Sequence, residues 1–129
     1  MNRNAKEWYR AMQYDLETAE LLLEKKRLIY VVFLSVQMVE KALKALWVDT
    51  RDNYPPKTHN LIRLSKLLGV WSKFTRDQRR FVAFINPLYN AIRYPDAHAA
   101  VEDSLDEAVA NEILDEAKEV CRWIEDQLS

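Results

Sequence analysis

An arginine and a histidine with four residues between them, Arg93 and His98, are the side chains of this sequence best suited to chemistry. Arginine carries a permanent cation whose planar fork matches phosphate oxygens, and histidine can take up and return a proton near neutral pH. Together they could cleave RNA, because the histidine can activate a ribose 2′-hydroxyl while the arginine stabilises the phosphorane. One pair supplies a base but no separate acid, so two copies facing each other across a dimer axis would supply both.

The same two residues also have structural interpretations. Arg93 stands in the last turn of a predicted helix, where a cation satisfies terminal carbonyls and favours the helix dipole. His98 would then be an exposed loop histidine. In a further interpretation the chain is a helical adaptor in which Arg93 forms a core salt bridge with Asp15.

Four polar or aromatic residues near Arg93 are candidates for binding a nucleotide or substrate. Asn86 and Asn90 lie one and two turns before Arg93 on the same predicted helix face, where they could hold a ribose or a phosphate oxygen. Tyr94 could stack on a base. Asp96, on the other side of Pro95, is the fourth candidate.

Two carboxylates, Asp15 and Glu40, fall at or beside predicted apolar faces. A buried carboxylate needs a partner, so we predict an internal polar network that fixes the register of the helices. Glu40 with Lys44 is also an ordinary i,i+4 helix pair. An alternative role for Asp15 is to orient Arg93 or to tune His98. The network is predicted to include Asp15, Glu40, Lys44 and His59, with Lys41 and Arg93 as further possible partners.

The composition favours a single helical domain spanning residues 1–129. The chain has one glycine and four prolines among 129 residues, which disfavours the turn-rich pattern of small β domains. Nineteen basic and twenty acidic residues nearly cancel, which removes the usual electrostatic argument for tight non-specific nucleic-acid binding but does not exclude a small local basic site. Cys121 is the only cysteine, and neither histidine belongs to a ligand cluster, so we predict no metal and no cofactor. No signal peptide or membrane-length apolar run occurs, and we expect a cytoplasmic protein.

Hydrophobic periodicity predicts five helices and no strand. The second is apolar over most of its circumference, so it should lie at the centre. Pro87 should kink the fourth helix and Pro95 should end it. The predicted helices cover residues 4–24, residues 29–50, the segment HNLIRLSKLL, the stretch from Thr75 to Pro95, and residues 105–127.

Helix ends are predicted from capping residues. Thr58 is the expected N-cap of the third helix and Gly69 its C-cap. Thr75 with Gln78, and Ser104 with Glu107, match the capping box that opens a helix. Short loops between long helices then imply an all-α, up-and-down antiparallel bundle of four long helices plus a short one.

The residue pattern resembles the HEPN domain family (higher eukaryotes and prokaryotes nucleotide-binding) over nearly the whole chain. It is carried by WYRAMQYDLETAELLL, FLSVQMVEKALKALWV, KTHNLIRLSKLL and NAIRYPDAH, followed by an amphipathic last helix. The resemblance implies a helical bundle that commonly dimerises. It also implies that active members are metal-independent endoribonucleases, in which an arginine and a histidine four to six residues apart meet at the dimer cleft. Arg93 and His98 match that motif.

The resemblance further implies a partner. Small prokaryotic members are often paired with a minimal nucleotidyltransferase that acts as antitoxin to the HEPN toxin. Some of these toxins carry a tyrosine two residues after the histidine that the antitoxin modifies with AMP, whereas this chain has Ala100. The RYPD form, with Tyr94 after the arginine, is similar to a branch whose members are not uniformly catalytic. The alternative function is therefore a non-catalytic module that binds a nucleotide or a partner protein.

Overall fold

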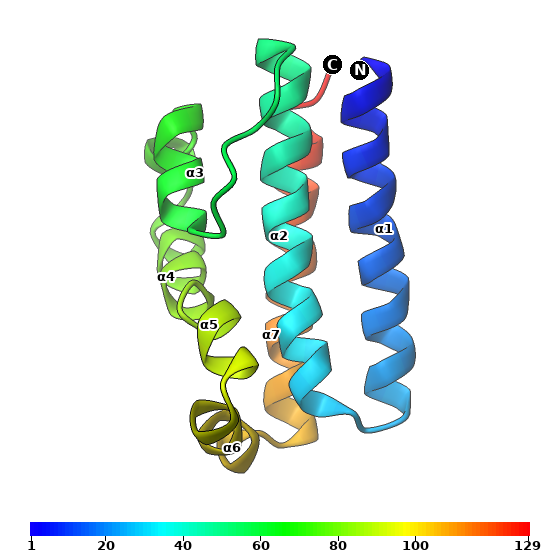
Figure 1. Ribbon diagram of the computed structural model, residues 1–129, viewed down its shortest axis with the longest axis vertical. Coiled ribbons are helices and arrows are strands. Elements are labelled where there is room, and N and C mark those ends of the chain that lie inside the picture. Colours follow the sequence, from blue (N-terminus) through cyan, green and yellow to red (C-terminus); the bar gives the residue numbers. More distant parts are fainter.

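The computed structural model describes residues 1–129 and consists of helices joined by short turns and one longer loop. The all-α prediction is confirmed. In Figure 1, α1, α2 and α7 run along the long axis, and α3 to α5 form a column beside α2 with α6 across its lower end. The helices are α1 (Arg3–Glu24), α2 (Leu28–Arg51), α3 (Leu61–Leu68), the 3₁₀ turn η1 (Trp71–Lys73), α4 (Arg76–Ile85), α5 (Leu88–Arg93), α6 (Pro95–Ser104) and α7 (Glu107–Glu125).

Helix α2 is the centre of the bundle, as its wide apolar surface predicts. It packs against α1 and α7 along their length and against α3, α5 and α6 on its other side. Its valines, Leu43, Leu46 and Met38 are buried, and so are two charged residues, Glu40 and Lys44. The central position of α2 places these two charges between the other helices.

The predicted fourth helix is divided in two. It breaks at Asn86 and Pro87 into α4 and α5, because proline removes a backbone donor and crowds the preceding turn. The Thr75–Gln78 capping box opens α4 as predicted. Gly69 ends α3 with φ 75°, a left-handed conformation that glycine adopts at low cost.

Two predicted helix starts are wrong. Asn60, and not Thr58, caps α3 by accepting a hydrogen bond from the backbone N–H of Arg63. Asp106, and not Ser104, caps α7 in the same way, with Val109 as donor. In both cases several residues of the favoured capping types stand close together, and the path of the incoming chain decides among them.

Residues 95–104 were predicted as a loop and form α6 instead. Pro95 ends α5 as expected, but it is also the first residue of the next helix. The first position of a helix suits proline, since its fixed φ is helical and its missing N–H would have no helical partner there. This correction changes the setting of His98, which lies in α6 and not in a loop.

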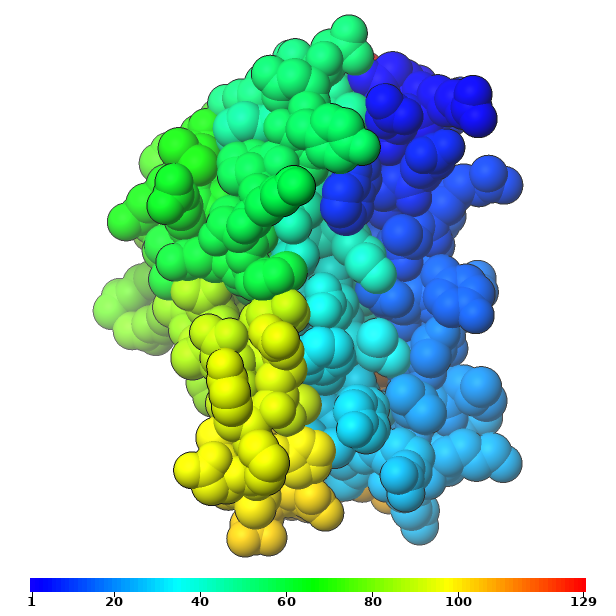
Figure 2. Space-filling model, viewed as in Figure 1, coloured from blue at the N-terminus to red at the C-terminus, as the bar shows by residue number.

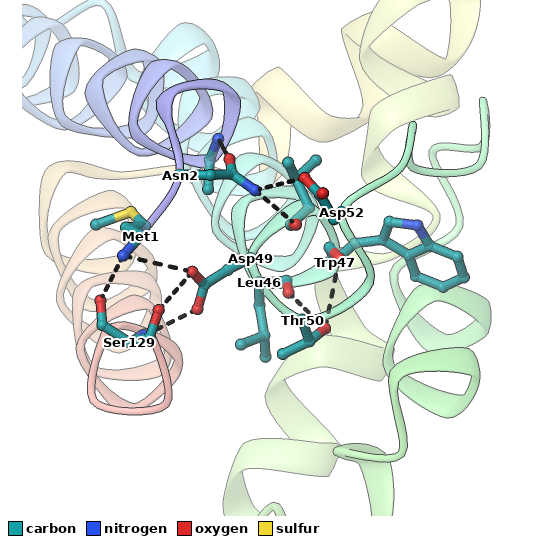
Figure 3. A network of polar contacts seen from close by, with 10 residues as sticks. Met1, Asn2, Leu46, Trp47, Asp49, Thr50, Asp52 and Ser129 are labelled. Atoms are coloured by element: carbon teal, nitrogen blue, oxygen red, sulfur yellow. Dashed lines mark hydrogen bonds and ion pairs between the residues drawn. The ribbon is translucent and has the colours of Figure 1, made fainter.

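The two chain ends meet beside the C-terminal part of α2 (Figure 3). The side chain of Asp49, only 4% exposed, accepts hydrogen bonds from the backbone N–H of Ser129 at 2.8 Å and from its hydroxyl at 2.7 Å. The N-terminal ammonium of Met1 lies 3.8 Å from the same carboxylate. Burial by itself raises the pKa of Asp49, but the hydrogen bonds from Ser129 and the nearby ammonium outweigh it and lower this pKa below its usual value.

None of the helices has the combination of length and apolar character needed to cross a membrane.

Candidate functional site

Arg93 and His98 lie at one open cavity. Helices α2, α5 and α6 line this cavity, whose volume is about 550 Å³. In Figure 2 the yellow surface of α5 and α6 adjoins the cyan surface of the first half of α2 on one face of the molecule. The structure therefore brings together the two side chains that the sequence singles out. The cavity is lined by Tyr30, Phe33, Ile92, Arg93, Pro95 and His98.

The break at Pro95 orients the imidazole. Because α5 ends at Arg93, the carbonyl of Ile92 has no helical partner, and His98 Nδ1 lies 2.9 Å from that oxygen. The backbone N–H of His98 donates to the carbonyl of Tyr94 at 2.7 Å, within the first turn of α6. A carbonyl can only accept, so Nδ1 carries the proton and Nε2 is the nitrogen with a free lone pair in the neutral ring.

An acidic residue faces that second nitrogen. Glu102, one turn further along α6, places Oε2 3.4 Å from His98 Nε2. The side chain of His98 is 27% exposed. Its ring lies edge-on to the ring of Tyr30, with the two ring centroids 6.3 Å apart. Glu102 is not among the predicted site residues, because its i,i+4 spacing from His98 becomes a contact only when residues 95–104 form a helix.

Arg93 is exposed and forms no ion pair within the chain. Its guanidinium carbon lies 5.0 Å from the centre of the Tyr89 ring, one helical turn back along α5. The core salt bridge between Arg93 and Asp15 does not form, since Asp15 pairs with Lys41 at 2.6 Å. The guanidinium fork is thus available to an anion from solution.

The other predicted binding residues are placed differently. Asn86 accepts a hydrogen bond from the backbone N–H of Leu61 at 2.7 Å and donates to Asn60 Oδ1 at 3.2 Å, so its amide supports the start of α3. Asn90, Tyr94 and Asp96 are exposed, and none of them lines the cavity. Tyr94 is 60% exposed. A role for these four in nucleotide binding stays a prediction.

Three of the four residues of the predicted polar network lie in contact. Glu40 accepts a hydrogen bond from Lys44 Nζ at 3.1 Å, and His59 Nδ1 lies 2.8 Å from the other carboxylate oxygen. Asp15 belongs to the separate pair with Lys41. Tyr89 joins the network, because its hydroxyl lies 3.0 Å from His59 Nε2. Nothing in the local sequence indicates this contact between residues 30 positions apart.

No three histidine, cysteine or acidic side chains gather where they could hold a metal ion.

Comparison with known proteins gives one consistent result. Residues 5–127 match the HEPN domain family. The crystal structure of TT1696 from Thermus thermophilus is similar over 99% of this chain and 100% of that one, with 26% identity and a TM-score of 0.82. The structure of ST0689, an archaeal HEPN homologue, is similar over the full length of both chains, with 22% identity and a TM-score of 0.73, which shows the shared fold. A search among curated proteins finds no significant match.

Proposed function

This chain belongs to the HEPN domain family, and we propose that it is a homodimeric endoribonuclease that needs no metal and uses Arg93 and His98. The observation that carries the proposal is the placement of both side chains at one open cavity. The chemistry of the two groups suits a phosphodiester, since one is a permanent cation and the other a proton acceptor and donor.

The proposed reaction starts at His98 Nε2, which takes the proton of a ribose 2′-hydroxyl. The 2′-oxygen attacks the adjacent phosphorus, and the bond from phosphorus to the 5′-oxygen breaks. The leaving 5′-oxygen takes a proton from the second histidine, and the products carry a 2′,3′-cyclic phosphate and a 5′-hydroxyl. Arg93 donates hydrogen bonds to the phosphorane oxygens, where negative charge is greatest in the transition state.

Glu102 fits this scheme as a partner of the protonated ring. When His98 holds both protons, the Glu102 carboxylate at 3.4 Å can pair with Nε2. The Ile92 carbonyl fixes the other nitrogen, so the imidazole keeps one orientation through the cycle.

A symmetric dimer would supply the second histidine. The cavity is open and carries apolar and aromatic groups, including Tyr30, which is 47% exposed. Close beside it, Tyr94 is 60% exposed. An isologous interface over this face would cover both rings and bring two Arg93–His98 pairs together.

Replacement of His98 by asparagine tests the proposal. An asparagine amide can still donate to the Ile92 carbonyl, but it cannot accept and return a proton, so the fold should survive and catalysis should not. We expect the rate of single-turnover RNA cleavage in EDTA to fall by roughly 10²- to 10⁴-fold. A comparable loss is expected for Arg93→Ala, roughly 10²- to 10³-fold. Cleavage at the wild-type rate in His98→Asn protein, purified in parallel, would refute the assignment.

A second function, binding of a nucleotide or partner without catalysis, is favoured by the contacts of His98. Both of its ring nitrogens already have partners within the chain, and Tyr94 presents an exposed ring for stacking. Calorimetry with AMP and with ATP tests this function. Binding that weakens in Tyr94→Leu protein would support it, and the absence of heat with both nucleotides would count against nucleotide binding.

We propose a minimal nucleotidyltransferase as the partner protein, on the basis of the family resemblance. Co-expression of the two proteins should give a complex on size-exclusion chromatography and should suppress RNA cleavage. Separate elution with undiminished cleavage would contradict this pairing.

A further inference from the structure

A line of polar and aromatic side chains connects the centre of the bundle to Arg93. It begins with the ion pair of Lys44 and Glu40 in α2, whose side chains are 7% and 5% exposed. His59, in the loop before α3, contacts Glu40 through Nδ1 at 2.8 Å. Tyr89, in α5, contacts the other side of the imidazole. The line therefore joins α2, the α2–α3 loop and α5 through a single histidine.

The ring of Tyr89 is held by its neighbours. The His59 ring stacks on it with centroids 4.0 Å apart and an angle of 19°, and the tyrosine hydroxyl lies 3.0 Å from His59 Nε2. Phe33 stacks against it with centroids 5.8 Å apart and an angle of 22°. Contacts with two flat rings leave little freedom to rotate about χ1 or χ2, so Tyr89 presents a fixed platform.

Arg93 rests on that platform. Its guanidinium carbon is 5.0 Å from the ring centre, inside the distance of about 6 Å at which a cation over an aromatic ring is attracted to it. No carboxylate holds Arg93, so the Tyr89 ring is the group that attracts its charge within the chain. An acidic partner would compete with phosphate for the guanidinium fork, whereas an aromatic face orients the cation and leaves all its N–H groups free.

The hydrogen-bond directions along the line are consistent. The Glu40 carboxylate accepts from Lys44 Nζ and from His59 Nδ1–H, which leaves Nε2 of a neutral ring to accept from the Tyr89 hydroxyl. A buried ion pair contributes little net stability compared with apolar side chains of the same size. Apolar side chains in place of Glu40 and Lys44 would not orient His59 and, through it, Tyr89.

We propose that Tyr89 is a positioning residue for Arg93, and that Glu40 and His59 hold Tyr89 in place. The inference rests on the proposed function for the use of Arg93, but the geometry it predicts can be measured without RNA. The Tyr89–Arg93 contact keeps the guanidinium at the cavity wall shared with His98. Without it, the side chain of Arg93 would sample several rotamers in solvent.

The direct test is NMR of the Arg93 side chain, whose Nε–H signal is assigned by its loss in Arg93→Lys protein. The ring current of Tyr89 should shift this signal from its ordinary position. We expect the shift to vanish in Tyr89→Leu, to persist in Tyr89→Phe and to diminish in His59→Leu. Tyr54→Leu is the matched control, because Tyr54 is 87% exposed in the loop before α3. An Arg93 signal unchanged in Tyr89→Leu would overturn the proposal.

Cleavage kinetics give the second readout. Tyr89→Leu should lower kcat by roughly three- to thirty-fold, the loss expected for one cation–π contact, with a smaller change in KM. The effect falls on kcat because phosphoryl charge is greatest in the transition state. If Tyr89→Leu moves the Arg93 signal but leaves kcat at the wild-type value, the positioning role is overturned.

The two proposals fail separately. If the wild-type protein cleaves no RNA while the Arg93 signal still depends on Tyr89, the ribonuclease assignment is wrong and the positioning contact stands. If the wild type cleaves RNA and the Arg93 signal is unchanged in Tyr89→Leu, the positioning contact is wrong and the ribonuclease assignment stands.

Discussion

Removal of the Glu40 side chain should destabilise the protein more than removal of its partner. The Lys44 side chain is 7% exposed, and its Nζ lies 5.5 Å from the centre of the Trp8 ring. In Glu40→Leu the Lys44 ammonium loses its anion, and the Trp8 ring is the group left to interact with its charge. In Lys44→Met, the Glu40 carboxylate keeps His59 at 2.8 Å. The two variants therefore leave unequal charges behind, although each breaks the same ion pair.

The magnitudes follow from that difference. Breaking a buried pair by removing one member costs about 3–5 kcal/mol, and contact with the Trp8 ring should keep Glu40→Leu near the lower figure, about 3 kcal/mol. Because Glu40 retains a partner, Lys44→Met should cost only about 1–2 kcal/mol. The double variant Glu40→Leu/Lys44→Met leaves no buried charge of the pair and should lie within about 1 kcal/mol of wild type.

Thermal and urea unfolding followed by circular dichroism at pH 7 measures these differences. An unfolding entropy of about 2.1 cal/mol/K per residue converts 1 kcal/mol to about 4 °C in Tm for a chain of this length, so Glu40→Leu should melt about 11 °C lower. We expect the urea m-value to stay unchanged, and an unchanged m-value would indicate that each variant exposes the same surface on unfolding as the wild type. A loss below about 1 kcal/mol in Glu40→Leu would refute the reasoning. A double variant as unstable as the sum of the single losses would refute it too.

Two further predictions concern the ends of α2 and α3. The pKa of Asp49 is lower in the folded than in the unfolded protein, so its contribution to stability is present above the unfolded pKa of about 4 and is lost as pH falls further. The Tm difference between wild type and Asp49→Asn should accordingly be largest near pH 7 and shrink as pH falls below about 4; a difference independent of pH would contradict the role of the Ser129 contacts. At Gly69, with φ 75° and open space around the Cα, alanine meets no clash but must adopt a left-handed backbone, which costs about 1 kcal/mol. Gly69→Asn should lose less in urea unfolding, and equal losses for the two variants would argue against backbone strain as the cause.

The local sequence was sufficient for the helices with strong apolar periodicity. The wide apolar surface of residues 29–50 determines that α2 is central, and the prolines determine where the fourth helix breaks and where α5 ends. Capping was less predictable. Thr58 and Asn60 both suit an N-cap, as do Ser104 and Asp106, and only the direction of the entering chain selects one of each pair.

Arg93 and His98 could be singled out by their types and spacing, and their role in catalysis stays a prediction. The proline between them could be expected to interrupt the helix. Their surroundings depend on the tertiary structure. The Ile92 carbonyl holds one nitrogen of His98, and the Glu102 contact exists only because Pro95 starts a helix.

The least local feature is the platform under Arg93. The i,i+4 spacing of Tyr89 and Arg93 can be read from the sequence. The stacking of His59 on the Tyr89 ring cannot, because these two residues are 30 positions apart. The i,i+4 pair of Glu40 with Lys44 could be predicted from the sequence, but the contact between Glu40 and His59 depends on where the α2–α3 loop crosses the bundle. Side-chain type and periodicity thus determine which groups must be buried, paired or capped. The packing of α2, α5 and the loop decides which groups meet, because contacts between distant segments form only when the whole core closes.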